Sequence, residues 1–124
     1  MRTKSVVIYF AVVLAAIAWN IYLGEATTLQ YIGCFRDEKN DQRDFEKTER
    51  MWGILTPTLC AVYCIDRGYI FMGLGYGKNC RCGMAYGKHG QVAETDCNDA
   101  CEGDGSDMCG GKQRNSVYRI NQCK

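Results

Sequence analysis

Short stretches of apolar residues, separated by polar segments, follow one another along most of the 124-residue chain. Four of them have the aromatic and β-branched composition, or the short alternating pattern, of strands: residues 31–35, 69–76, 79–83 and 116–120. Within the second of these, Gly73 and Gly75 stand two residues apart, and alternate residues of a strand point to the same face. This strand is therefore expected to have one bare side.

One segment has the signals of a helix at both ends. Thr56 offers a capping hydroxyl, Pro57 occupies the first helical position, and Gly68 follows the run LCAVYCIDR of residues 59–67. The residues expected on its buried face are Leu59, Cys60, Tyr63 and Cys64.

The polar segments predict loops. Residues 36–50 are so rich in charge that they predict an exposed loop. Residues 84–114, rich in Gly, Asp and Asn, predict a long loop with one helical turn around residues 97–101. One helix, a few strands and long loops predict a small α+β domain in which the helix packs on an antiparallel sheet.

The N-terminal segment, residues 1–26, has the layout of a secretory signal peptide. Two basic residues precede an uncharged apolar run at residues 6–18, and a stretch with small residues ends at Ala26. We expect cleavage after Ala26, a mature chain of residues 27–124 and a secreted, extracellular product. Cleavage after Ala18 and an uncleaved membrane anchor are the alternatives.

Charge narrows the function classes. The chain has 15 basic and 14 acidic residues, and cleavage after Ala26 would leave 13 of each, for a formal net charge of zero. A neutral chain without a basic tract is not expected to bind nucleic acid, and it favours uncharged sugars over sulfated polyanions. No apolar run of membrane length follows residue 26, so the mature chain is expected to have no membrane span.

All nine cysteines follow the expected signal peptide, and secretion favours their oxidation. Cys60 and Cys64 are about 6 Å apart along a helix axis, and Cys80 and Cys82 are about 6.6 Å apart along a strand. The matching distances predict two bridges between helix and strand, either parallel or crossed. A zinc site built from these four thiols fits the usual ligand spacings poorly, so we expect neither a metal nor a cofactor.

These segments together resemble the WSC domain, a cysteine-rich family. The resemblance covers residues 31–120 and rests on YIGCF at 31–35, TP-x-x-C-x-x-x-C at 56–64, YIFMGLGYG-x-x-C-x-CG at 69–83, DCN-x-x-C-x-GD-x-x-x-x-CGG at 96–111 and RNSVYRI at 114–120.

The resemblance also implies a disulfide pairing. The implied bridges are Cys34–Cys97, Cys60–Cys80, Cys64–Cys82 and Cys101–Cys109, which selects the uncrossed arrangement between helix and strand. Cys123 lies outside the pattern and is expected to be unpaired within its own chain. A free thiol, a mixed disulfide and a covalent homodimer through Cys123 are all open.

WSC domains are regarded as carbohydrate-binding modules, so the resemblance implies a secreted module that binds polysaccharide of a cell wall or extracellular matrix. The candidate ligand-binding residues are Tyr76, Asn79, Arg81, Tyr86 and Trp52, because rings stack on sugar faces and amides and cations bind hydroxyl groups. Arg81 stands where the family often has an aromatic residue. The alternative is a protein-binding module, or a ligand of an extracellular receptor.

An enzyme is not expected. The single histidine, His89, lies in the glycine-flanked segment Tyr86–Gly90, and no serine or unpaired cysteine lies near it in the sequence. The sequence therefore predicts binding without a reaction.

Overall fold

The computed structural model describes residues 27–122. The expected signal peptide and Cys123 lie outside these residues, and no described helix is long and apolar enough to cross a membrane. The elements, in chain order, are β1 (Thr27–Arg36), η1 (Asn40–Gln42), β2 (Lys47–Arg50), α2 (Pro57–Asp66), β3 (Phe71–Gly75), β4 (Asn79–Gly83), η2 (Glu94–Asp96), β5 (Ala100–Cys101), β6 (Asp104–Met108) and β7 (Arg114–Gln122), where η1 and η2 are single turns of 3-10 helix.

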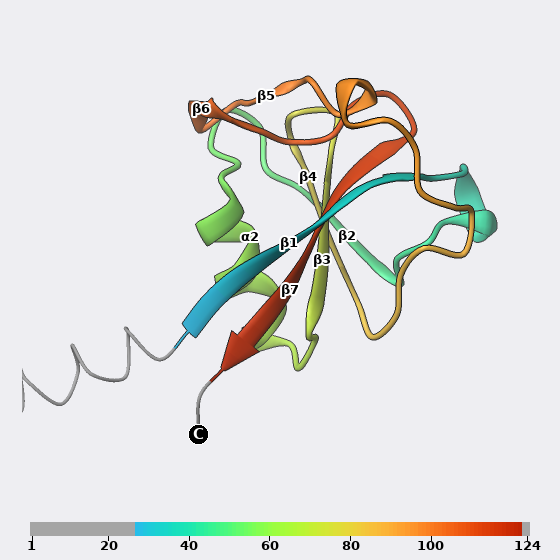
Figure 1. The fold of residues 1–124 in the computed structure, drawn as a ribbon. Helices are drawn as coiled ribbons and strands as arrows, with labels where there is room; N and C mark the ends of the chain where they lie inside the picture. The colour runs from blue at the N-terminus through green and yellow to red at the C-terminus, as the bar shows by residue number, and fades with distance from the viewer. Residues whose placement is uncertain (1–26, 123–124) are drawn as a thin grey trace, which may run out of the picture. The chain divides into compact units, whose positions relative to one another are not determined.

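Five strands form the main sheet, in the order β1-β7-β3-β4-β2, and β5 with β6 forms a separate hairpin. The pairs β2–β4, β3–β4 and β3–β7 are antiparallel. Helix α2 lies beside these strands, with the η1 segment on their other side (Figure 1). Residues Leu29–Asn121 pack as one compact unit. The prediction of a small disulfide-rich α+β domain with one main helix is confirmed.

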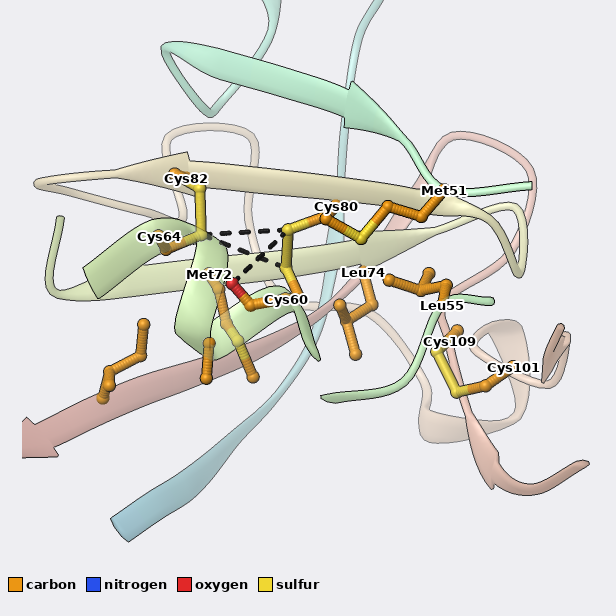
Figure 2. Packing of buried hydrophobic residues seen from close by; sticks show 12 residues of the cluster. Met51, Leu55, Cys60, Cys64, Met72, Leu74, Cys80, Cys82, Cys101 and Cys109 are labelled. Atoms are coloured by element: carbon orange, nitrogen blue, oxygen red, sulfur yellow. Dashed lines mark hydrogen bonds between the residues drawn. A yellow bond between two sulfur atoms is a disulfide. The ribbon is translucent and has the colours of Figure 1, made fainter. Parts of the chain in front are cut away.

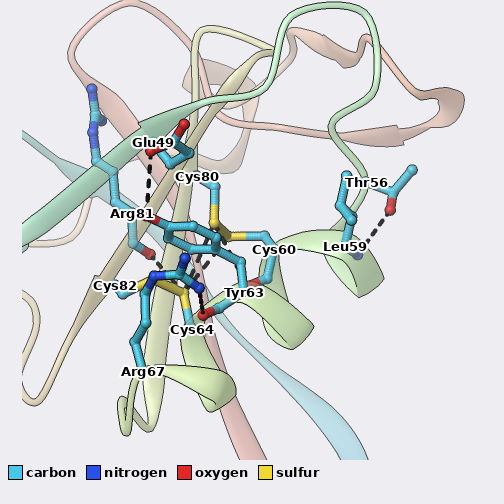
Figure 3. The surroundings of a disulfide bond; sticks show 10 residues. All are labelled: Glu49, Thr56, Leu59, Cys60, Tyr63, Cys64, Arg67, Cys80, Arg81 and Cys82. Carbon is cyan, nitrogen blue, oxygen red and sulfur yellow. Dashed lines mark hydrogen bonds between the residues drawn. A yellow bond between two sulfur atoms is a disulfide. The ribbon is translucent and has the colours of Figure 1, made fainter.

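Helix α2 begins and ends as its sequence predicts. The Thr56 hydroxyl accepts a hydrogen bond from the backbone N–H of Leu59 at 3.0 Å (Figure 3), and Gly68 has a φ of 85°, which suits a residue just past a helix end. The predicted buried face is wrong by one position, because Leu59 is exposed and Ala61 is buried instead. The two bridges to β4 set the rotation of the helix, so its buried residues are Pro57, Cys60, Ala61 and Cys64.

The structure contains four disulfides, and they join the same pairs that the family resemblance implies: Cys34–Cys97, Cys60–Cys80, Cys64–Cys82 and Cys101–Cys109. Figure 2 shows the two helix-to-strand bridges side by side, above Met72 and Leu74. The sulfurs of Cys60, Cys64 and Cys80 lie within 4.8 Å of one another because these bridges are neighbours. In the loop-entropy view, the bridge across 63 residues stabilises the fold by roughly 4 kcal/mol.

The opposite face of the sheet carries a second, smaller core made by Phe35, Phe45 and Val117. A Cβ on Gly73 would lie 2.6 Å from Cε2 of Phe45, so the side of β3 that its glycines leave bare is filled by this ring. Phe45 belongs to residues 36–50, which were expected to be an exposed loop. That prediction is wrong, because the segment contributes a buried ring and strand β2 as well as loop.

The long loop predicted over residues 84–114 is also more structured than expected. Its helical turn, η2, precedes Cys97 rather than following it, and residues 100–108 form the β5–β6 hairpin. Within β6, Oδ1 of Asp104 accepts hydrogen bonds from the backbone N–H and the hydroxyl of Ser106, in the part of the hairpin where the pairing register shifts.

Candidate functional site

A pocket of about 380 Å³ opens on the face of the sheet that α2 does not cover. Its walls come from four places in the chain: the segment after β1, the end of β2 with the loop that follows, the β3–β4 turn with β4, and the approach to β7. The lining residues are Asp37, Glu38, Lys39, Asn40, Arg43, Arg50, Trp52, Tyr76, Lys78, Asn79, Arg81 and Gln113.

Arg81 forms the floor of the pocket and is only 3% exposed. On β4 it alternates with Cys80 and Cys82, so the cysteines face α2 and the guanidinium faces the other way. A Cβ on Gly75 would lie 2.7 Å from Nη1 of Arg81, so this glycine makes the room that the guanidinium fills.

A carboxylate and an amide hold the guanidinium in place. Nη1 of Arg81 lies 2.9 Å from Oδ2 of Asp37, which is 2% exposed, and it also donates to Oδ1 of Asn115. The other oxygen of Asp37 accepts hydrogen bonds from the backbone N–H groups of Glu38 and Asp44, both at 2.9 Å. Asp37 thus ties the segment after β1 to the floor of the pocket, and a buried charge held by this many partners is rigid.

The β3–β4 turn forms one wall. Tyr76 and Gly77 have φ values of 56° and 73°, and the backbone N–H of Lys78 donates to the carbonyl of Gly75 at 3.2 Å. Two central residues with positive φ are typical of a type I′ hairpin turn, which costs an aromatic residue about 1–2 kcal/mol. The turn keeps the Tyr76 ring near the floor, with its centroid 5.9 Å from Cζ of Arg81.

Trp52 forms the exposed rim of the pocket. Its side chain is 61% exposed, and Nζ of Lys78 lies 3.9 Å from the centroid of its ring, a cation–π contact. The loop that carries it is held by its backbone, since the N–H of Met51 donates to the carbonyl of Lys78 and the N–H of Gly53 donates to Oε1 of Glu102 at 2.8 Å. The backbone of the loop is therefore held in place, and the indole that it carries is largely exposed, with the Lys78 ammonium over its ring.

Two buried polar atoms of pocket-lining residues have no hydrogen-bond partner among the described residues. They are Oδ1 of Asn79 and Nε of Arg81. An unpaired buried polar group costs roughly 1–3 kcal/mol, so such groups mark places where a ligand can supply the missing bond. Rotation of the Asn79 amide about χ2 exchanges its oxygen and nitrogen, which lets either atom face the pocket.

The pocket is electrostatically one-sided, with five basic and two acidic residues in its lining. Burial lowers the pKa of Arg81, and the positive charge of Arg43 acts in the same direction, whereas Asp37 raises it. Arginine is the most basic side chain in proteins, and the contact with Asp37 favours the charged form of Arg81.

Four of the five residues predicted to bind ligand line this one pocket: Trp52, Tyr76, Asn79 and Arg81. Tyr86 is not among the lining residues. Its ring packs against Phe35 at 5.3 Å and Phe71 at 4.8 Å between centroids, next to the second core. Arg81, predicted only as a ligand-binding residue, is buried.

Sequence reasoning missed the contribution of the segment after β1. Asp37, Lys39 and Arg43 line the pocket, yet the charge run around them was read as solvated surface. The signal that could have found them is an arginine between two bridged cysteines, since a charge held there needs a carboxylate from elsewhere. His89, the single histidine, lies away from this lining, and its Nε2 contacts the carbonyl of Gln42.

Fold and site define a small disulfide-rich α+β module with a polar, aromatic-rimmed pocket. The chain belongs to the WSC domain family, whose family model matches residues 31–111. It is 29% identical over 102 residues to "Xylosyltransferase oxt" of Drosophila pseudoobscura pseudoobscura, covering 82% of this chain and 12% of that protein.

Two further relatives come from a fungus and a mammal. The chain is 34% identical over 100 residues to "Putative fungistatic metabolite" of Chaetomium globosum, covering 75% of this chain and 43% of the relative. It is 35% identical over 85 residues to "Kremen protein 1" of Rattus norvegicus, covering 67% and 18%. The chain thus spans less than half the length of these curated relatives.

Proposed function

We propose that this chain is an extracellular, non-catalytic module that binds a glycan of a cell wall or extracellular matrix in the pocket rimmed by Trp52. The observation that carries the proposal is that the exposed indole of Trp52 and the unpaired buried amide oxygen of Asn79 belong to residues lining the same pocket. A sugar ring has an apolar face that packs on an indole and hydroxyl groups that both donate and accept hydrogen bonds. Such a ligand suits this pairing of groups.

The dimensions and rigidity of the site also support a binding role. A volume of about 380 Å³ lies within the usual range of ligand pockets. The floor is held by the Asp37–Arg81 pair and the wall by the β3–β4 turn, so little ordering is needed when a ligand binds. A rigid, partly apolar pocket of this kind favours recognition.

Secretion is part of this proposal. Residues 1–26 are proposed to act as a signal peptide, so that the mature chain of residues 27–124 folds in an oxidising compartment. The four disulfides support this, because structural disulfides persist mainly in secreted and extracellular proteins. Two of the relatives, both from Drosophila, are xylosyltransferases by their name, and the matching segment is a small part of each.

The test is binding of the secreted chain to an array of neutral and acidic glycans, followed by calorimetry on the best ligand. Trp52→Ala is expected to weaken binding roughly tenfold or more if the indole packs on the sugar. Ile54→Ala is the matched control, because Ile54 is similarly exposed two residues away and lies outside the pocket lining. It is expected to bind like the parent protein.

Two results would overturn the proposal. One is a folded protein that binds no glycan, and nanomolar affinity for a protein receptor in its place would favour the protein-binding alternative. The other is equal glycan affinity of the parent and the Trp52→Ala variant, which would move the site away from this pocket.

A further inference from the structure

The two acidic residues of the pocket are already neutralised by the protein. Asp37 pairs with Arg81 at 2.9 Å, and Oε1 of Glu38 lies 2.9 Å from Nη2 of Arg36, which is outside the lining. Every other charged residue of the lining is basic. Both carboxylates of the pocket are therefore paired already, and neither is left to neutralise these other basic residues.

Four cations around the pocket have no such partner. These are Lys39, Arg43, Arg50 and Lys78, and no carboxylate of residues 27–122 lies within 4.0 Å of their charged nitrogens. They come from the segment after β1, the end of β2 and the β3–β4 turn, so the fold brings them together from distant parts of the chain.

Gathering like charges around one hollow is unfavourable unless something compensates for it. The repulsion is felt at the floor, where Arg43 lowers the pKa of Arg81 in addition to the effect of burial. The neighbouring hollow of about 560 Å³ has three acidic and two basic residues in its lining, so it does not share the excess of cations found in the Trp52 pocket.

We propose that the glycan bound in the Trp52 pocket is anionic and that the surrounding cations hold its carboxylate or sulfate group. This inference rests on the proposed function and specifies its ligand class. The anionic group of the sugar pairs with the cations, which lack a carboxylate partner. The indole packs against the apolar face of the sugar, and the Asn79 amide hydrogen-bonds to a hydroxyl group. Charge-assisted hydrogen bonds to the anion are about twice as strong as neutral ones, so the charged group dominates the selection.

The zero net charge expected for the mature chain leads to the opposite expectation, an uncharged sugar. Net charge governs the field far from the protein, and physiological salt screens that field over about 8 Å. A ligand in the pocket meets the local charge instead. The local excess of cations therefore outweighs the neutrality of the chain as a whole.

The test compares charged polymers with their neutral counterparts. Polygalacturonate against its carboxyl-reduced form measures the effect of a carboxylate, and dextran sulfate against dextran measures the effect of a sulfate. At least one charged member is expected to bind roughly tenfold or more tightly than its neutral counterpart, with an affinity that falls as salt is added. Which of the two pairs shows the difference identifies the anionic group.

Matched variants separate a site from general charge attraction. Lys78→Gln and Arg50→Gln are expected to weaken binding of the charged polymer roughly tenfold and to reduce its advantage over the neutral counterpart. Lys47→Gln makes the same change in net charge on strand β2, outside the lining, and is expected to stay within about twofold of the parent protein. Melting curves of all three variants establish that they are folded.

The possible results distinguish a failure of the anionic-ligand inference from a failure of the proposed glycan-binding function. If neutral and charged polymers bind equally and Trp52→Ala weakens both, the glycan site stands and the anionic ligand is refuted. If Lys47→Gln weakens binding as much as Lys78→Gln, or an oligonucleotide or an acidic peptide binds as tightly as the charged polymer, the selection of an anionic glycan is refuted. If no polymer of either kind binds to folded protein, the proposed function fails as well.

Discussion

Removing the charge of Asp37 should destabilise this domain far more than removing the charge of Glu38 beside it. Both carboxylates lie 2.9 Å from an arginine nitrogen, but Asp37 and Arg81 are buried whereas the Glu38–Arg36 pair is largely at the surface. Asp37→Asn keeps the shape and both backbone hydrogen bonds of the side chain. It leaves the Arg81 guanidinium buried with only the neutral Asn115 amide oxygen as an acceptor among its assigned contacts.

Breaking a buried ion pair by removing one partner costs about 3–5 kcal/mol, because the remaining charge keeps its desolvation penalty and loses its compensation. An exposed pair contributes about 0–1 kcal/mol. We therefore expect a loss of about 3–5 kcal/mol for Asp37→Asn and under about 1 kcal/mol for Glu38→Gln. The first loss is a large share of the 5–15 kcal/mol by which a domain is usually stable.

Urea unfolding at neutral pH with the disulfides intact, followed by circular dichroism, measures both losses. The buried pair should respond little to added salt, while the exposed pair should weaken. The double variant Asp37→Asn/Arg81→Met should lose over about 1 kcal/mol less than the sum of its single variants, because it buries no lone charge. Equal losses for Asp37→Asn and Glu38→Gln, or additive effects of the Asp37 and Arg81 changes, would refute the reasoning.

Two further predictions concern pH and backbone geometry. The pKa of Tyr31 is raised, mainly by burial and to a smaller extent by its hydrogen bond to Glu94. The unfolded chain therefore loses this proton at lower pH than the folded one, so the contribution to stability is full below about pH 10 and is lost as the pH rises further. Phenolate absorbance should show a late-titrating tyrosine that Tyr31→Phe removes, and an unchanged titration would contradict the assignment. Gly110 has a φ of 70°, and a Cβ there would clash with the carbonyl oxygen of Leu74. Gly110→Ala should therefore lower the free energy of unfolding, measured by thermal unfolding, by at least about 2 kcal/mol. A variant as stable as the parent would show that this turn relaxes freely.

The sequence by itself determined the elements whose signals are local. Helix α2 begins after Thr56 and ends before Gly68 because a cap and a stop act within a few residues of the backbone they satisfy. Strands β3 and β4 were expected over residues 69–76 and 79–83 and run over 71–75 and 79–83, since their composition and glycine spacing are properties of single segments. The resemblance carried by the cysteine motifs added the family and the same four disulfide pairs.

Strands β2 and β6 could not be found in this way. Their sequences, KTER and DGSDM, contain one β-branched residue, Thr48, and no aromatic residue, so their composition is not typical of strands. β2 is extended because β4 offers it a row of backbone hydrogen bonds, with Lys47 opposite Cys82 and Arg50 opposite Asn79. A strand at the edge of a sheet tolerates charged residues, so its formation depends on its partner rather than on its own composition.

The tertiary structure alone decided where the charges of the site lie. Arg81 is buried because Gly75 leaves space for its guanidinium and Asp37, 44 residues earlier in the chain, neutralises it. The cations of the Trp52 pocket come from segments that are far apart in the sequence, so neither net charge nor any local pattern reports their gathering. The electrostatic energy of a group depends on its distances in space and on its burial, and both exist only once the chain has folded.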